Sequence, residues 1–510
     1  MSPRLPFLVL VGLVGGSIVV GSAQGSRPTL VAAPRPVAGL TAPAVRPAAA
    51  GATWYCAGGT AQDGGLADHR VIVANPTDGE ATGSLTVFPG RLELAGTTTE
   101  PAASDRTPTT EAFAVAARSR ATFRLADMRS APVAAALVEL DRGGLAVEHQ
   151  VVGANGGDVA PCASAAASSW HFAWGSTSRD AREVLVLFNP FASDIAVDAS
   201  FATEAGVREP LGWQALIVPA RGVVGIDVGQ DVTRRDQVAA TIRARGGGRL
   251  IVDRLQVFDG RAGRRGLSLS LGQPDPTEIA LFPGGRVGAH TGERIVLYNP
   301  DDDTAEVEVH VQTPGIDRAP VQPFEMVVRP GRYEVLDYAA EDRLPRDVDH
   351  VTVVRSRNGV PVVAERVQNA GSQLSAAPGA LFRASTWVFP AVQADGAQPP
   401  SFTVVNPDAD HPARVSVDLY AEGRRIPRPE LQQLDVPAGG RITVPVPMPL
   451  PAGAGSAAPA ATAGSPGWRG ASVVVRSDRA VVAARDGRGD GVVRAGGPGI
   501  PVGDHLDPPL

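Results

Sequence analysis

The sequence predicts an all-β protein: four tandem Ig-like antiparallel β-sandwich domains that follow an N-terminal export or anchor segment. Three observations favour this class. An apolar run followed by Asn-Pro and a polar turn occurs four times along the chain. Later stretches place apolar residues at every second position, which is typical of half-buried strands. The 58 Gly and 45 Pro residues supply many turns, so long helices are not expected to dominate.

The Asn-Pro pairs set the period of the repeat. The four pairs are Asn75 and Pro76, Asn189 and Pro190, Asn299 and Pro300, and Asn406 and Pro407. They are 114, 110 and 107 residues apart, about the length of one sandwich domain. Proline cannot donate to a strand ladder, and an Asn side chain can close a local turn. Because the pair occurs in every copy, we predict that it ends a strand and turns the chain, and that it is not a ligand site.

The repeat also sets the predicted domain boundaries. We expect a signal peptide or membrane anchor at 1–23, an Ala/Pro-rich tether at 24–52, sandwiches at 53–167, 168–275, 276–384 and 385–500, and a tail at 501–510. The four sandwiches are called repeats 1 to 4 below. A β-propeller is the alternative fold, because several short strands in each repeat could also be divided into blades.

Two local features complete the predicted fold. Each repeat is expected to end in a β-hairpin, most clearly in repeat 3, where Asn358 and Gly359 would supply the positive φ angles of a tight turn. The stretches 95–111 and 452–467 contain polar or small residues that bury too little area to offset the cost of ordering them. We predict that both are flexible loops.

The N-terminus has the parts of an export signal. Arg4 is followed by an apolar stretch over 5–20 and by small residues at 21–23. About 16 apolar residues is short for a spanning helix, but an uncleaved anchor stays an alternative. We therefore expect an extracytoplasmic protein that is secreted or anchored to the cytoplasmic membrane by this segment.

The two cysteines, Cys56 and Cys162, flank repeat 1. An even number of cysteines in an exported chain favours a disulfide. The bond would close a loop of about 107 residues, for which chain entropy gives about 4–5 kcal/mol as an upper figure. Two thiols without further Cys or His ligands are too few for a metal site.

No sequence motif indicates catalysis. The chain has no Gly-x-Ser-x-Gly or His-Glu-x-x-His motif, and it contains no Lys to complete Ser-x-x-Lys. Its eight histidines are not spaced to place two on one strand face, so we expect no metal centre. A net charge of -6 without a basic run argues against nucleic-acid binding. We predict that the protein is not an enzyme and has no catalytic, cofactor-binding or metal-binding residues.

Basic residues occupy matching places near the end of each repeat. These are His149, Arg254, Arg366 and Arg485. Recurrence again favours a structural role, in which the stem covers the sheet and the charged head pairs with a carboxylate or a carbonyl.

The chain resembles a known family, domain-of-unknown-function family 5719. The resemblance depends on the export segment, the tether, the Trp54-Tyr55-Cys56 opening, Cys162 and the Asn-Pro repeats. Members of this family are secreted or membrane-anchored envelope proteins of high-GC Gram-positive bacteria. The resemblance implies tandem β domains in the cell envelope, and it supplies no catalytic residues.

We therefore expect a non-catalytic envelope protein, a structural or binding module that assists envelope polysaccharide assembly. Its expected partner is an envelope protein or polysaccharide, with the membrane as a further partner if the N-terminal segment is uncleaved. The alternative function is a carbohydrate-active enzyme with a site between domains. That function would require two carboxylates at the distance found in glycosidases.

Overall fold

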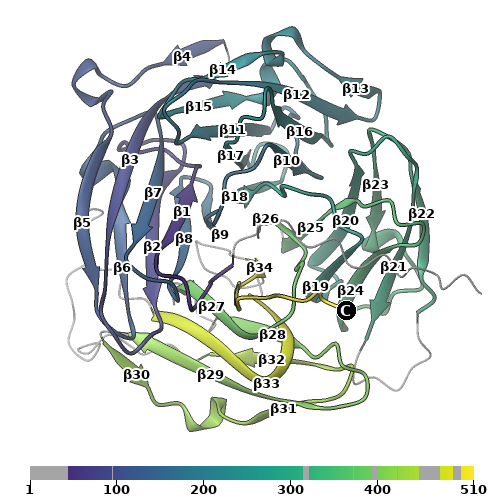
Figure 1. Cartoon of the computed structure of the whole chain (residues 1–510). Coiled ribbons are helices and arrows are strands. Elements are labelled where there is room, and N and C mark those ends of the chain that lie inside the picture. The colour runs from purple at the N-terminus through teal and green to yellow at the C-terminus, as the bar shows by residue number, and fades with distance from the viewer. Residues whose placement is uncertain are drawn as a thin grey trace, which may run out of the picture. The chain divides into compact units, whose positions relative to one another are not determined.

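The strands of each repeat divide between two sheets in the computed structural model, which describes residues 44–94, 96–313, 321–370, 373–392, 400–421, 423–446, 471–485 and 496–510 (Figure 1). We call the sheet with the strand that runs into Asn-Pro the inner sheet and its partner the outer sheet. Apolar side chains from both sheets of a repeat share one buried cluster. The predicted all-β class is confirmed.

In repeat 1 the inner sheet contains β6 (Ser119–Arg124), β2 (Asp68–Asn75), β8 (Ala146–Gly153) and β9 (Gly156–Pro161), and the outer sheet β1 (Ala52–Cys56), β7 (Val133–Leu140), β3 (Ala81–Leu94), β4 (Thr97–Thr99) and β5 (Thr109–Val115). In repeat 2 the inner sheet contains β15 (Gly222–Asp227), β11 (Ala181–Asn189), β17 (Ile251–Asp259) and β18 (Arg265–Leu271), and the outer sheet β10 (Ser169–Phe172), β16 (Ala239–Ala244), β12 (Ile195–Thr203), β13 (Gly206–Arg208) and β14 (Leu216–Val218).

In repeat 3 the inner sheet contains β23 (Arg332–Asp337), β20 (Thr291–Asn299), β25 (Val363–Ala370) and β26 (Gln373–Pro378), and the outer sheet β19 (Ile279–Arg286), β24 (Asp349–Ser356), β21 (Ala305–Gln312) and β22 (Phe324–Val328). In repeat 4 the inner strands are β32 (Arg441–Pro445), β28 (Ser401–Val405), β33 (Ala471–Arg485) and β34 (Gly497–Pro498), and the outer strands β35 (Ile500–Val502), β27 (Ala384–Val392), β29 (Ala413–Ala421), β30 (Arg424–Ile426) and β31 (Leu434–Val436). The long β33 takes part in both sheets, because its first half pairs with β27 and β29 and its second half with β28.

The described helical segments have three or four residues each. They are α2 (Leu125–Met128), η1 (Ala103–Asp105), η2 (Leu211–Trp213), η3 (Val228–Gln230), η4 (Tyr338–Ala340) and η5 (Pro429–Leu431). Within the residues that the structure describes, no helix is long and apolar enough to cross a membrane. The predicted signal or anchor at 1–23, and the predicted loop at 452–467, lie outside the described residues.

The expected terminal hairpin is replaced by a crossing between sheets. In repeat 3, β24 belongs to the outer sheet and β25 to the inner sheet, so the two strands do not pair with each other. Gly359 has a φ of 76°, but Asn358 stays outside the left-handed region and instead donates to the Thr304 carbonyl over 2.8 Å. Alternation and a turn signal identify two strands, but they do not say whether those strands share a sheet. The two-sheet arrangement favours a sandwich description over a propeller blade.

Residues 44–52 differ from the predicted tether. Val45 is buried, donates to the Pro501 carbonyl over 2.9 Å, and packs in the same cluster as Ile500. The sequence 95–111 is not wholly irregular either, because Thr97–Thr99 adds a short strand to β3. In both cases pairing with a distant or neighbouring strand supplies order that local composition does not indicate.

Each repeat contacts the next one along the chain, and repeat 4 also contacts repeat 1. β3 of repeat 1 pairs in parallel with β15 of repeat 2, and β18 of repeat 2 with β26 of repeat 3. β19 of repeat 3 contacts β28 and β33, and β27 of repeat 4 contacts β2 and β8 of repeat 1. Thr41–Leu510 accordingly forms one compact unit. The division into four separate immunoglobulin-like domains stays a prediction.

Candidate functional site

The four Asn-Pro turns share one hydrogen-bond pattern. In repeat 2, the Asn189 side-chain amide donates to Ser193 O over 2.8 Å and to Pro219 O over 3.0 Å, and its oxygen accepts from Phe191 N over 3.0 Å. Asn75, Asn299 and Asn406 make the corresponding bonds. All four Asn residues are 0% exposed. Each side chain therefore ties the end of one strand to a turn of the next, and none offers its amide to solvent.

The predicted disulfide between Cys56 and Cys162 is confirmed. The two sulfur atoms are 2.09 Å apart and the Cα atoms 4.7 Å apart. Both residues are fully buried in the core of repeat 1. The bond fastens β1 to the segment that follows β9.

The recurrent basic residues occupy one register position in all four inner sheets. Each basic residue is paired across the strands with the residue four positions before the Asn of its repeat. The residue that precedes each basic residue is paired with the one three positions before that Asn. The basic residues and their cross-strand neighbours are His149 and Val71, Arg254 and Leu185, Arg366 and Ile295, and Arg485 and Phe402. The preceding residues are Glu148, Asp253, Glu365 and Ala484. The inner sheets therefore carry an acidic and basic dipeptide in three of four repeats.

These side chains pair across the interfaces between neighbouring repeats, which we call seams. Arg254 of repeat 2 donates to Glu365 of repeat 3, with Nη1 and Oε2 2.9 Å apart. Arg485 of repeat 4 donates to Glu148 of repeat 1, with Nη2 and Oε1 2.6 Å apart. His149 Nε2 of repeat 1 lies 3.6 Å from Asp253 Oδ2 of repeat 2.

The direction is the same in each case: the basic residue of one repeat faces the acidic residue of the next. At the seam from repeat 3 to repeat 4, Ala484 occupies the acidic position. There Arg366 lies over the Phe282 ring of its own repeat, 5.7 Å from the ring centre. The position six residues before each Asn supplies a further group: Glu293 in repeat 3, Glu183 in repeat 2 and His69 in repeat 1.

The pKa values of Glu293 and Glu183 are shifted in opposite directions. Burial alone would raise the pKa of Glu293, but His350, 3.2 Å from Oε1, and Arg366 lower it below its ordinary value. Burial raises the pKa of Glu183 to about 8, although Arg254 opposes the shift. The direction of this shift favours the protonated form of Glu183, and Arg254 is already paired with Glu365.

The position of Glu183 also depends on a glycine. A Cβ at Gly175 would lie 2.3 Å from Glu183 Oε1, so a larger residue there would displace the carboxyl.

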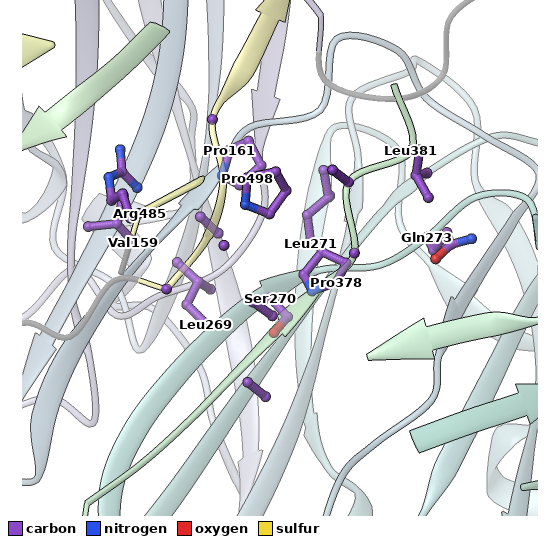
Figure 2. Close-up of a pocket in the computed structure, with 18 of the residues that line it drawn as sticks. Val159, Pro161, Leu269, Ser270, Leu271, Gln273, Pro378, Leu381, Arg485 and Pro498 are labelled. Carbon is purple, nitrogen blue, oxygen red and sulfur yellow. The ribbon is translucent and has the colours of Figure 1, made fainter. Parts of the chain in front are cut away.

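A cavity lies where the last inner strands of the four repeats meet (Figure 2). Its volume is about 90 Å³. Each repeat contributes the residue that stands opposite its acidic position: Pro161, Leu271, Pro378 and Pro498. Arg485 forms part of the wall. This volume is below the roughly 150 Å³ that holds a benzene molecule, so the cavity suits only a small apolar group.

Small residues stand opposite the basic side chains, and they leave the space that those side chains fill. They are Ala160, Ser270, Ala377 and Gly497. Ser270 also accepts a hydrogen bond from Arg254 over 3.0 Å. In the part of the chain that the structure describes, no group of three or more His, Cys, Asp or Glu side chains is arranged to hold a metal ion.

Sequence reasoning missed the contact between His69 and His149. The two residues are 80 positions apart, and their side chains are 3.0 Å apart on neighbouring strands. The signal that could have found them is their register relative to Asn75, since Glu or His recurs six places before the Asn in three repeats.

The fold and these seams define the class: an all-β protein whose tandem two-sheet repeats are joined by buried charged side chains. Residues 144–372 match the model of a family of unknown function, DUF5719, so the resemblance expected from the sequence is confirmed over these residues. No curated protein matches the chain.

Two solved structures are similar to parts of the chain. One is the crystal structure of Thermotoga maritima 1070, with 19% identity, a TM-score of 0.19, and coverage of 21% of this chain and 95% of that one. The other is the Anabaena sensory rhodopsin transducer, with 22% identity, a TM-score of 0.16, and coverage of 18% and 83%. At these TM-scores neither likeness supports an inference about the function of this chain.

Proposed function

We propose that the protein is a non-catalytic, exported module of the cell envelope that binds envelope polysaccharide and assists its assembly. The observation that carries the proposal is the series of buried pairs between repeats. The ionic side chains Glu148, Arg254 and Glu365 are each less than 5% exposed and are occupied in holding repeats together. Groups used in this way support a rigid frame, and they are not available to a substrate.

The disulfide supports export. Cys56–Cys162 is a bond that persists in oxidising compartments outside the cytoplasm and is rare within it. Secretion or anchoring through the N-terminal segment is part of the proposal.

A shallow groove on repeat 1 is the surface where we expect the polysaccharide to bind. It lies over β3, β5 and β7, and Gly83, Phe113, Glu139 and Asp141 line it. Gly83 stands directly across from Phe113 and has no side chain to cover that ring. Thr82 donates to Asp141 over 2.7 Å, and this bond lowers the pKa of the Asp141 carboxyl. An apolar ring edge beside acidic side chains suits a sugar, whose hydroxyl groups can donate to them.

One observation favours a second candidate function, the carbohydrate-active enzyme. Glycosidases use a carboxyl of raised pKa beside a second carboxyl group, and Glu183 and Glu365 interact electrostatically. Burial raises the pKa of Glu365 too, and Arg254 opposes that shift. Both are buried at the seam between repeats 2 and 3, with 0% and 3% exposure. A glycan could reach them only if that seam opened.

Co-sedimentation of the full chain with insoluble cell-wall polysaccharide tests the proposal. We expect the wild type to sediment with the polysaccharide, and the Glu139→Gln, Asp141→Asn double variant to bind at least tenfold more weakly. The matched control is Glu325→Gln, Glu334→Gln, two exposed carboxylates of repeat 3, which should bind as the wild type does. A wild type that stays in the supernatant would refute polysaccharide binding. Release of reducing ends that is lost in Glu183→Gln would establish the enzyme instead.

A further inference from the structure

Two histidines and a carboxylate lie in hydrogen-bonding order at the seam between repeats 1 and 2. His69 Nδ1 is 2.9 Å from the Ala134 carbonyl oxygen, and His69 Nε2 is 3.0 Å from His149 Nδ1. His149 Nε2 in turn lies 3.6 Å from Asp253 Oδ2, which belongs to the next repeat. All three residues are 0% exposed. The order of the atoms fixes where protons must be.

Two neutral imidazoles carry two ring protons in total. A carbonyl oxygen only accepts, so one of these protons is on His69 Nδ1. The second proton forms the hydrogen bond between the two rings. Because neutral His69 already has its proton on Nδ1, its Nε2 accepts, and His149 Nδ1 donates. With two neutral rings, His149 Nε2 is therefore a bare lone pair that faces Asp253.

An ionised Asp253 would be poorly compensated in this arrangement. Its Oδ2 accepts from the backbone amides of Ala57 and Gly58, over 2.9 and 2.8 Å. Among the described residues, Asp253 Oδ1 and His149 Nε2 have no hydrogen-bond partner. A buried carboxylate against a lone pair, without a cation, is strongly unfavourable.

The charged neighbours do not supply that cation. On β8, Glu148 is paired with Arg485, and on β17, Arg254 is paired with Glu365. On β9, Asp158 is itself acidic, and burial raises its pKa to about 7. From the segment before β2, the Ala57 and Gly58 amides reach Asp253, and a backbone hydrogen bond from Gly58 acts on His149 and opposes the lowering of its pKa. From β7 the Ala134 carbonyl reaches His69.

We propose that the cluster of His69, His149 and Asp253 binds a third proton at neutral pH, held between His149 Nε2 and the Asp253 carboxyl, and that this proton joins repeat 1 to repeat 2. With it the cluster has no net charge, whether the proton is on the imidazole or on the carboxyl. Without it a buried negative charge is left at the seam. Burial also raises the pKa of Asp253 to about 7 and lowers that of His149 well below its ordinary value, which favours the carboxyl as the place of the proton.

The sign of the pH dependence follows. In the unfolded chain Asp253 titrates near 3.8, so between pH 4 and 7 the folded protein holds a proton that the unfolded chain has lost. The contribution of the Asp253 proton to stability therefore falls as pH rises through that window and is constant above it. The two imidazoles contribute in the opposite direction below about pH 6.5, because burial lowers their pKa values and the unfolded chain keeps protons there that the folded protein lacks. At the acid end, burial lowers the pKa of His69 to about 4. Below that pH a proton on His69 Nε2 faces the His149 Nδ1 proton and breaks the bond between the rings.

Counting protons directly tests the proposal on the full chain. Nitrogen-15 NMR of histidine-labelled protein at pH 6 reports the protonation of each ring nitrogen, and the infrared carbonyl stretch lost in Asp253→Asn reports a protonated carboxyl. We expect three protons on the cluster: a doubly protonated His149 with an ionised Asp253, or neutral rings with a protonated Asp253. Two neutral rings beside an ionised Asp253 would overturn the proposal.

A variant provides an independent measurement. Asp253→Asn keeps an oxygen for the Ala57 and Gly58 amides but cannot titrate. We expect proton uptake on folding between pH 4 and 7, obtained from the pH dependence of unfolding, to fall by one proton relative to the wild type. The control Asp302→Asn, in an exposed turn, should leave it unchanged. An unchanged proton uptake in Asp253→Asn would refute the proposal. If this variant does not fold, the wild type decides alone: the histidine nitrogen-15 spectrum reports both rings, and the carbon-13 signal of the Asp253 carboxyl reports its protonation. Two neutral rings with a carboxyl signal that shifts with pH near 4 would refute the proposal.

Discussion

Arg485 in the last repeat donates to Glu148 in the first repeat, across 337 positions of sequence. Glu148 also accepts from Ala391 N over 2.9 Å, and Arg485 lies over the Phe389 ring. Both ionic side chains are less than 10% exposed. The pair therefore joins the two ends of the folded unit, and it does so where water does not screen it.

Replacing Arg485 by Met should destabilise the protein by about 3–5 kcal/mol, because Glu148 is left buried without its cation. The measurement is denaturant unfolding of the full chain at pH 7. The double variant Arg485→Met, Glu148→Gln is the control, and we expect it to recover a large part of the loss, since the uncompensated charge is gone. A single variant within 1 kcal/mol of the wild type would show that the pair does not hold the repeats together.

The disulfide gives a second prediction. Cys56→Ser, Cys162→Ser should lose about 2–5 kcal/mol of stability, because the unfolded chain is no longer closed into a loop. Mass mapping of unreduced protein from its native compartment should find one cross-linked peptide pair. Two free thiols in that material would contradict both the bond and the assignment to an oxidising compartment.

The repeat could be predicted from sequence because its signals are local. Asn189 and Pro190 mark the end of a strand, and alternating residues mark the strand that follows, so the all-β class is visible in short windows. The recurrence of Arg254 and Arg485 at matching places also predicted a structural pairing with carboxylates. What could not be predicted is which carboxylate, because Glu365 and Glu148 come from other repeats, more than 100 residues away.

The dependence on residues far away in the sequence also explains why the terminal hairpin and the tether were predicted wrongly. Whether β24 pairs with β25 or crosses to the other sheet depends on what packs against each strand, and nothing within the two strands records it. The order of residues 44–52 depends on Ile500 and Val502 at the other end of the chain. The contact of His69 with His149 needs strand register, which periodicity alone does not fix.

The buried Asn side chains give a third prediction. In a half-solvated turn the loss of Asn299 would cost about 1 kcal/mol, but Asn299 is fully buried and holds the carbonyls of Asp303 and Val328 over 2.7 and 2.8 Å. Asn299→Ala leaves these acceptors without their donor, so we expect a loss of about 2–3 kcal/mol. Asn189→Ala should cost a similar amount, because its bonds are equivalent.

Thermal unfolding of the full chain measures both variants. The matched control is Asn358→Ala, which loses side-chain hydrogen bonds at an exposed turn outside the repeat motif and should therefore cost less, about 1 kcal/mol. Asn299→Asp is a sharper test, since its carboxylate would face carbonyl oxygens and should cost more than Asn299→Ala. A silent Asn299→Ala that abolished polysaccharide binding would make that turn a site, against the argument from repetition.

The last prediction concerns Glu183, whose pKa burial raises to about 8. The folded protein holds a proton on this carboxyl that the unfolded chain releases near pH 4.5, so the wild type should lose stability as pH rises from about 5 to 8. The slope for one proton is about 1.4 kcal/mol per pH unit.

Glu183→Gln keeps the shape of the neutral acid and cannot ionise, so its stability relative to the wild type should increase across this range and level off above pH 8. Denaturant unfolding at pH 5, 6.5 and 8 measures the difference, with Glu334→Gln as the exposed control. A difference between wild type and Glu183→Gln that does not change with pH would mean that Glu183 is ionised throughout, and that Arg254 balances two carboxylates at the seam between repeats 2 and 3.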